Sequence, residues 1–239
     1  MVNDMNLTKA EKNKQIPKII HYVWVGGKPL TPLAKNCLAS WHKYLPDYQF
    51  KLWNESNSPM NHHYVQKMYA DKKWAFVADY IRFWALEKEG GIYLDTDTEV
   101  LKSFDNLLVH NVFFGQTKDG ITAAGVIGAV PHHQVIKDIL AVYDNDFLYS
   151  VERTSPRTIT EVLNKNHYDN VTIYDFRYFN PCDDGEIRTT EKLALAYTDN
   201  HWAGSWVSFS LLRKWARRIG VMSLLRKFKN LPLFNKFRI

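Results

Sequence analysis

Asp95 and Asp97 have the spacing in this chain that most clearly suggests chemistry. They follow residues 92–94, an apolar run that predicts a buried strand. In an extended chain, residues i and i+2 point the same way, so both carboxylates are expected to face one point, with Glu99 following. Two like charges this close are costly unless a cation lies between them. The pattern predicts a site for Mn²⁺ or Mg²⁺, which bind oxygen ligands and also diphosphate oxygens.

A D-x-D triplet, two aspartates separated by one residue, is expected about once by chance in a chain of this length. Asp144 and Asp146 form a second copy, which follows a helical pattern and is interpreted as a solvated helix end. The alternative for Asp95 and Asp97 is likewise a pair of acids in an exposed turn. The strand context favours the metal site, because open α/β sheets bind ligands at the carboxyl ends of their strands.

A second candidate pair, Asp79 and Arg82, is spaced i and i+3 on the helix predicted before this strand. That helix is apolar nearly all round and is expected to be buried. The pair is either an internal ion pair, or Arg82 binds a phosphate while Asp79 accepts hydrogen bonds from a ligand. Buried charges are rare, so the sequence leaves both interpretations open.

Two further candidates lie at the ends of other predicted strands. Trp24 precedes Gly26 and Gly27, and is either a core residue or a platform for a flat ring. His201 lies in a loop after a late strand. A neutral imidazole is a competent Mn²⁺ ligand, although a lone histidine is more often structural.

Strands and helices alternate along the chain, which predicts an α/β fold with a mostly parallel sheet. The domain is expected over residues 16–208, between a polar lead-in (1–15) and a basic amphipathic tail (209–239). Strands are predicted over 18–25, 48–54, 92–101, 112–116, 123–130, 171–176 and 194–197. Helices are predicted over 31–47, 62–91, 134–145 and 158–166.

The net charge of +6 is concentrated in the last forty residues. Residues 200–239 hold nine Lys and Arg and no acidic residue, whereas the rest holds 22 basic and 25 acidic residues. A basic amphipathic helix favours an anionic membrane surface. A helix packed on the body is the alternative, and nucleic acid is disfavoured because no binding motif accompanies the charge.

The cysteines and the lead-in indicate a compartment. Cys37 and Cys182 make no disulfide framework. The lead-in lacks the apolar segment of a signal peptide, and no apolar run approaches the roughly 20 residues of a membrane span. The expected localisation is cytoplasmic, peripheral on the inner face of the cell membrane.

Four segments together resemble glycosyltransferase family 32, the group with a D-x-D sugar-binding region. They are IPKIIHYVWVGG, AFVADYIRFWALEKEGGIYLDTDTEV, TSPRTITEVL and HWAGSW. The group includes yeast-type mannosyltransferases, bacterial capsule enzymes and, more distantly, the glucosylating domain of clostridial toxins. The resemblance covers residues 16–206 and implies a GT-A fold, with a Rossmann-like sheet that binds a nucleotide sugar at its carboxyl edge. Ser155 departs from the pattern, because the family usually has glycine there.

The resemblance implies nucleotide-sugar-binding roles for seven residues, which are Val23, Trp24, Asp79, Arg82, Tyr93, Asp95 and Trp206. Trp24, with Val23 beside it, matches the tryptophan that stacks on uracil in toxin-like members. Asp79 and Arg82 match a donor-binding pair, and Arg82 would also donate to the diphosphate. Tyr93 would lie beside the ribose.

The resemblance also implies a metal site. Asp95 would contact the ribose and sugar, and Asp97 and His201 would ligate Mn²⁺ or Mg²⁺. The catalytic candidates are Asp95, Asp97 and Arg82. Gly204 and Trp206 would close over the diphosphate. Toxin-like members have an acidic ligand and a serine where this chain has His201 and Gly204.

The implied activity is retaining transfer of a hexose from a nucleotide sugar, expected to be a UDP-sugar. The acceptor would be a glycan or lipid-linked oligosaccharide in capsule or other surface polysaccharide synthesis. One alternative is a haloacid dehalogenase-type phosphatase, although that pattern wants Thr or Val at the position of Glu99. Another is a non-enzymatic membrane-docking protein, which the intact Asp95, Asp97 and His201 disfavour.

Overall fold

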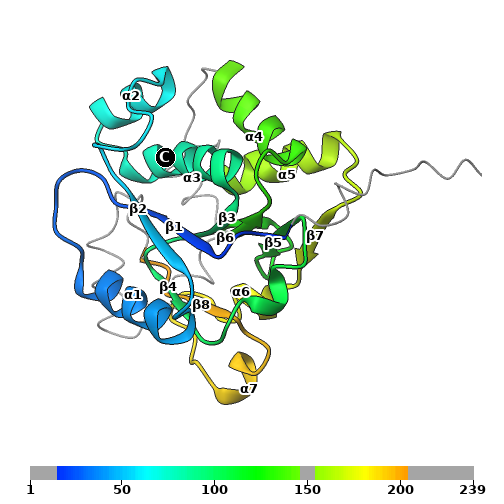
Figure 1. Ribbon diagram of the computed structural model, residues 1–239. Coiled ribbons are helices and arrows are strands. Elements are labelled where there is room, and N and C mark those ends of the chain that lie inside the picture. Colours follow the sequence, from blue (N-terminus) through cyan, green and yellow to red (C-terminus); the bar gives the residue numbers. More distant parts are fainter. Residues whose placement is uncertain (1–14, 146–153, 204–239) are drawn as a thin grey trace, which may run out of the picture.

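The computed structural model describes residues 15–145 and 154–203, and every structural statement below concerns these ranges. A central six-stranded sheet has the order β2-β1-β3-β6-β5-β7, and β4 and β8 form a separate two-stranded sheet. Helices cover both faces of the central sheet (Figure 1). Helices α2 to α5 lie on one face, and α1 and α6 lie on the other with the small sheet.

Three of the five strand pairings in the central sheet are parallel, which confirms the predicted mostly parallel α/β architecture. Strand β1 runs parallel to β2 and β3, and β5 runs parallel to β7. Strand β6 is antiparallel to both of its neighbours. The carboxyl ends of β1, β2 and β3 therefore share one edge, where β6 begins. The strands are β1 (Ile19–Val23), β2 (Gln49–Trp53), β3 (Gly91–Leu94), β5 (Val112–Gln116), β6 (Thr122–Ala129) and β7 (Val171–Tyr174).

Helix α1 (Pro32–Tyr44) forms where the sequence predicts it. The Thr31 side chain caps it by accepting a hydrogen bond from the Ala34 N–H, and a proline occupies its first position. Trp41 is fully buried on its inner face, and its indole N–H donates to the Thr98 carbonyl at 2.7 Å. This bond ties α1 to β4 (Thr98–Val100) directly after the two aspartates.

The single helix predicted over 62–91 is wrong, because the chain forms two helices there. Helix α2 (His63–Ala70) ends before Lys72, whose φ of +57° is incompatible with a continuous right-handed helix. Helix α3 (Trp74–Glu89) then runs to Gly90, which has a φ of +64°. A side chain at Gly90 would also meet Pro131 at 2.6 Å, so glycine is required at this stop.

Three strand predictions are also wrong. The strand predicted over 171–176 ends at Tyr174, because Phe176 begins a helix. Strand β3 ends at Leu94, and residues 95–97 form a turn closed by the Thr98 N–H on the Asp95 carbonyl (3.0 Å). Residues 194–197 are not a strand, since α7 (Thr190–Leu193) leads through a turn into β8 (Thr198–Asn200). The chain enters β4 after residues 95–97 and enters β8 after residues 194–197. These two strands pair antiparallel although they lie far apart in the sequence, so local patterns do not reveal where they begin.

The remaining helices pack the two apolar cores on either side of the central sheet. The core under α2 to α5 includes α4 (Gln134–Asn145) and α5 (Ser155–Lys165). The opposite core includes α1, the short helix over Asp105–Leu107 and α6 (Phe176–Phe179). None of the helices described is long and apolar enough to cross a membrane.

Candidate functional site

The turn after β3 carries Asp95 to the edge where the parallel strands end. Its main-chain N–H donates to the Gly125 carbonyl of β6 at 2.9 Å. Its Oδ1 accepts a hydrogen bond from the Tyr93 hydroxyl at 2.9 Å. A Cβ at Gly125 would lie 3.1 Å from Asp95 Oδ2 and 3.3 Å from the Asn200 amide nitrogen. Glycine at position 125 therefore leaves room for both polar groups at this point.

Asp97 lies at the other side of the same turn and contacts the segment after β8. Its Oδ2 accepts the Ala203 N–H at 2.8 Å, and its carbonyl accepts the His201 N–H at 2.9 Å. Burial and the negative charge of Asp95 raise the pKa of the Asp97 carboxyl to about 6. The expectation that an extended strand aligns the two carboxylates is wrong, since a turn brings them near each other instead.

Arg82 joins the acidic residues from α3. Its Nη2 lies 2.8 Å from Asp79 Oδ1 and 3.5 Å from Asp95 Oδ1. Its Nη1 donates to the Ala124 carbonyl at 2.7 Å, and its Nε donates to the Ala78 carbonyl at 3.3 Å. The guanidinium is therefore an internal partner of both carboxylates and of strand β6. The internal ion pair, which is one of the two interpretations of the sequence, is present.

Burial and charge act against each other in this cluster. Burial raises the pKa of Asp79, and Arg82 opposes that rise. For Arg82, burial acts to lower the pKa, but the groups of Tyr93, Asp95 and Asp79 together raise it above its ordinary value. The Tyr93 ring lies 4.6 Å from the guanidinium carbon, and burial raises the pKa of its hydroxyl. The cluster consequently holds a permanent positive charge beside two acids.

Ser155, the first residue of α5, is a member of this cluster that the sequence did not identify as one. Its hydroxyl donates to Asp79 Oδ1 at 2.7 Å, and its main-chain N–H also donates to that carboxylate. The only signal in the sequence was the departure of Ser155 from the glycine that the resemblance implies at this position. Gly125 and Asn200 were also missed, because no local pattern marks either position.

Val23 and Trp24 lie where β1 ends. Val23 is buried in the apolar core. Trp24 is half-buried, and its main-chain N–H donates to the Trp53 carbonyl at 3.0 Å. Its indole N–H donates to the Lys28 carbonyl at 2.6 Å, which closes the loop containing Gly26. Because β1 is parallel to β3, Trp24 occupies the same sheet edge as the two aspartates, and base stacking by its ring stays a prediction.

His201 follows β8 and reaches the turn through its main chain. Its imidazole Nε2 lies 2.9 Å from Glu99 Oε2, so the ring pairs with the third acid of the DTDTE run. Across the described ranges, no three His, Cys, Asp or Glu side chains are arranged to hold a metal ion. Metal ligation by Asp97 and His201 stays a prediction. Gly204 and Trp206 lie outside the described residues, as does the tail.

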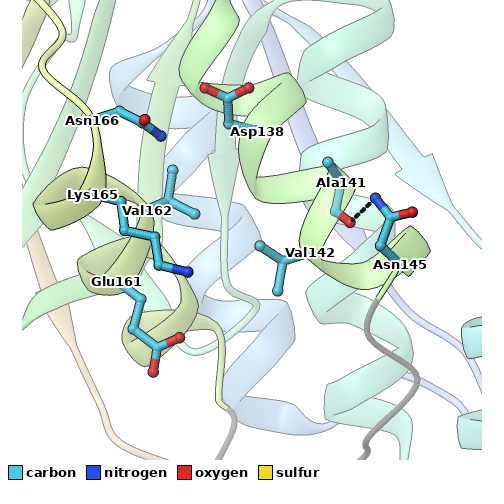
Figure 2. A pocket seen from close by; sticks show the side chains of 8 residues that line it. All are labelled: Asp138, Ala141, Val142, Asn145, Glu161, Val162, Lys165 and Asn166. Atoms are coloured by element: carbon cyan, nitrogen blue, oxygen red, sulfur yellow. Dashed lines mark hydrogen bonds between the residues drawn. The ribbon is translucent and has the colours of Figure 1, made fainter.

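A separate hollow of about 350 Å³ lies between α4 and α5. Figure 2 shows its lining, which mixes acidic, basic, amide and short apolar side chains. The lining residues are Asp138, Ala141, Val142, Asn145, Glu161, Val162, Lys165 and Asn166. None of them belongs to the cluster around the two aspartates, so this hollow is not the site that the sequence predicts.

Comparison with protein families agrees with the geometry. Residues 32–114 match the family described as glycosyltransferase sugar-binding region containing DXD motif. An uncharacterised glycosyltransferase of Acanthamoeba polyphaga mimivirus is 27% identical over 186 residues, which are 70% of this chain and 74% of the viral protein. Inositol phosphoceramide mannosyltransferase 2 of Schizosaccharomyces pombe is 29% identical over 136 residues, 52% of this chain. This chain spans only 37% of that fungal relative.

Solved structures share the fold. PaToxG glycosyltransferase superposes with a TM-score of 0.54 at 18% identity, over 64% of this chain and 70% of that one. A glycosyltransferase involved in glycosylation of the major capsid of PBCV-1 gives 0.53 at 13% identity, over 84% of this chain and all of that one. The comparisons support a transferase rather than a phosphatase or a non-enzymatic docking protein. With its GT-A fold and its DXD turn at the carboxyl edge of the sheet, the chain is similar to glycosyltransferases that have a DXD-containing sugar-binding region, which its residues 32–114 match.

Proposed function

We propose that this glycosyltransferase is metal-dependent and moves a hexose from a nucleotide sugar to a glycan or lipid-linked acceptor with retention of configuration. The observation that carries the proposal is the placement of Asp95 beside the buried Arg82, with Asp97 on the same turn, at the edge where β1, β2 and β3 end. Ligands of open α/β sheets bind at such an edge. The retaining course rests on the resemblance to family 32, and no enzyme nucleophile is assigned.

The residues at the turn fit a hard divalent cation. The pKa of the Asp97 carboxyl is raised to about 6 by burial and by Asp95, so the charge of Asp97 lacks full compensation. Carboxylate oxygens are preferred ligands of Mg²⁺ and Mn²⁺. Asp97 would hold the ion, with His201 as the second predicted ligand. The bound cation would supply charge stabilisation for the departing diphosphate.

The chain's own residues would orient the donor around that position. Asp95 is fixed by the Tyr93 hydroxyl and by the Gly125 carbonyl, which leaves its Oδ2 for a ribose or sugar hydroxyl. Trp24, at the end of the neighbouring strand, offers a ring for the nucleotide base. Uracil is the proposed base from the resemblance, and guanine is tested beside it because fungal relatives carry mannosyltransferase in their names.

We further propose that the acceptor belongs to surface polysaccharide synthesis, including capsule, and that the enzyme works at the inner face of the cell membrane. The support is the tail over 209–239, in which every charged residue is basic. Sedimentation with anionic liposomes tests this, comparing the full chain with one ending at residue 208. The truncated chain is expected to stay in the supernatant, and equal sedimentation would contradict the membrane role.

Binding and slow hydrolysis of a panel of nucleotide sugars test the activity. The panel contains UDP-glucose, UDP-galactose, UDP-N-acetylglucosamine and GDP-mannose, each with Mn²⁺, with Mg²⁺ and with a chelator. We expect one nucleotide class to bind and to be hydrolysed only with metal. A chain that binds none of them would refute the proposal.

The second D-x-D copy supplies a matched control for that test. Asp97→Asn removes a charge at the proposed metal site, whereas Asp144→Asn removes one at the exposed end of α4. We expect hydrolysis to fall at least tenfold in the first variant and less than twofold in the second. Equal losses would show that the turn after β3 has no special role.

A further inference from the structure

The contact between Ser155 and Asp79 joins α5 to α3 inside the cluster described above. Ser155 is 3% exposed, and its hydroxyl donates to Asp79 Oδ1 at 2.7 Å across 76 residues of sequence. Its main-chain N–H gives the same carboxylate a second hydrogen bond at the first turn of the helix. A carboxylate at a helix N-terminus is further stabilised by the helix dipole. Asp79 is therefore fixed from α5 as well as from α3.

Arg82 has little capacity left for a ligand. Its side chain is 5% exposed, and its three nitrogens already contact the carbonyls of Ala78 and Ala124 and the carboxylates of Asp79 and Asp95. A guanidinium offers five N–H donors, so these contacts use most of them. The arginine consequently acts on the site through the two acids that it bridges.

The Asp79 side chain keeps 10% exposure, so a ligand hydroxyl can still reach it. Its Oδ1 is occupied by Ser155 and Arg82 together. A glycine at position 155 would retain the main-chain donor and lose the hydroxyl. The serine thus adds a hydrogen bond that a glycine at this position could not supply.

We propose that Ser155 is a positioning residue of the donor site: it holds the Asp79 carboxylate on Arg82 and so sets the guanidinium between Asp79 and Asp95. The inference rests on the proposed nucleotide-sugar function. Ser155 touches no reacting atom in this arrangement, and its effect passes through Asp79. Removing its hydroxyl should let that carboxylate rotate and lower the affinity for the donor.

A double-mutant cycle on the full chain with Mn²⁺ tests this. The probe is whichever nucleotide sugar of the panel above the wild-type chain binds, titrated by calorimetry. A hydrogen bond to a charged group is worth enough that Ser155→Ala should weaken binding about tenfold. Ser155→Thr keeps the hydroxyl and should bind within twofold of wild type. In the Asp79→Asn background, Ser155→Ala should add less than a twofold loss.

Thr160→Ala is the matched control, because its hydroxyl lies on the same helix and donates only to the Pro156 carbonyl of α5 at 2.8 Å. It should bind the donor like wild type. If Ser155→Ala does not fold, Ser155→Gly supplies the same comparison. Wild-type affinity in Ser155→Ala or Ser155→Gly, or a full tenfold loss from Ser155→Ala on top of Asp79→Asn, would overturn the positioning role. Failure of the wild-type chain to bind any donor would instead refute the proposed function, and the inference with it.

Discussion

Lowering the pH should destabilise the sheet that carries the site, because the buried His21 ring is neutral in the folded chain. His21 lies in β1, is fully buried, and pairs in register with Tyr93 of β3. The Trp53 indole N–H donates to its Nδ1 at 3.0 Å, so the ring proton resides on Nε2, which lies 2.7 Å from the Gly90 carbonyl. Both nitrogens are satisfied by the neutral ring. A second ring proton would have to displace the Trp53 bond.

The size of the effect follows from the pKa of this imidazole. Burial lowers it from 6.5 to about 4. Because the folded pKa is depressed, the unfolded chain binds more protons between these values, and stability falls as the pH decreases from 6.5 towards 4. Each pKa unit corresponds to about 1.4 kcal/mol, so the full loss is about 3 kcal/mol, of which about 2 kcal/mol appears between pH 7 and pH 5.

The assay is urea unfolding of wild type and His21→Gln at pH 7, 6 and 5. Glutamine does not titrate, so its substitution adds a constant cost while removing this part of the pH dependence. We expect the stability difference between the two chains to shrink by about 2 kcal/mol from pH 7 to pH 5. His167→Gln is the control, since that ring is 91% exposed, and its curve should follow wild type.

Parallel pH dependences for wild type and His21→Gln, within about 0.5 kcal/mol, would refute the reasoning. Such a result would mean that the imidazole already carries a charge in the folded chain or that unfolding does not expose it. A direct NMR titration of the His21 ring checks the same point, with no protonation expected above pH 5.

Three further results are expected at the site itself. The Mn²⁺ affinity, measured by electron paramagnetic resonance, should fall about tenfold between pH 7 and pH 5. The reason is that the Asp97 carboxyl, whose pKa is raised to about 6, must lose its proton to bind the ion. An affinity independent of pH would remove Asp97 as a ligand. Trp24→Ala should weaken nucleotide binding by roughly 1–3 kcal/mol if the ring stacks on the base, and unchanged binding in calorimetry would exclude stacking. Gly125→Ala should reduce donor hydrolysis at least tenfold with a normal thermal unfolding midpoint, because its methyl group would lie 3.1 Å from Asp95 Oδ2; wild-type hydrolysis would show that this oxygen is not needed.

Local patterns were sufficient for much of the fold. The apolar run over 18–25, the threonine cap before Pro32 and the 3.6-residue periodicity over 134–145 correspond to β1, α1 and α4. They were sufficient because each signal lies within one element. The break at Lys72 was not predictable in this way, since the apolar periodicity of α2 and α3 nearly continues across it. The sequence predicts a strand through Asp95 for a similar reason, because the residues on both sides favour extended chain.

The sequence by itself determined the α/β class, the resemblance to DXD-containing glycosyltransferases and the chemical groups available at the end of β3. It could not decide what those groups contact. The Asp79–Ser155 bond joins residues 76 apart and the Glu99–His201 pair joins residues 102 apart. Both depend on how α5 and β8 pack against the rest of the chain, and that packing depends on the shapes of many side chains at once. Only the tertiary structure could therefore show that Arg82 is an internal bridge between two acids, held in part by a serine from another helix.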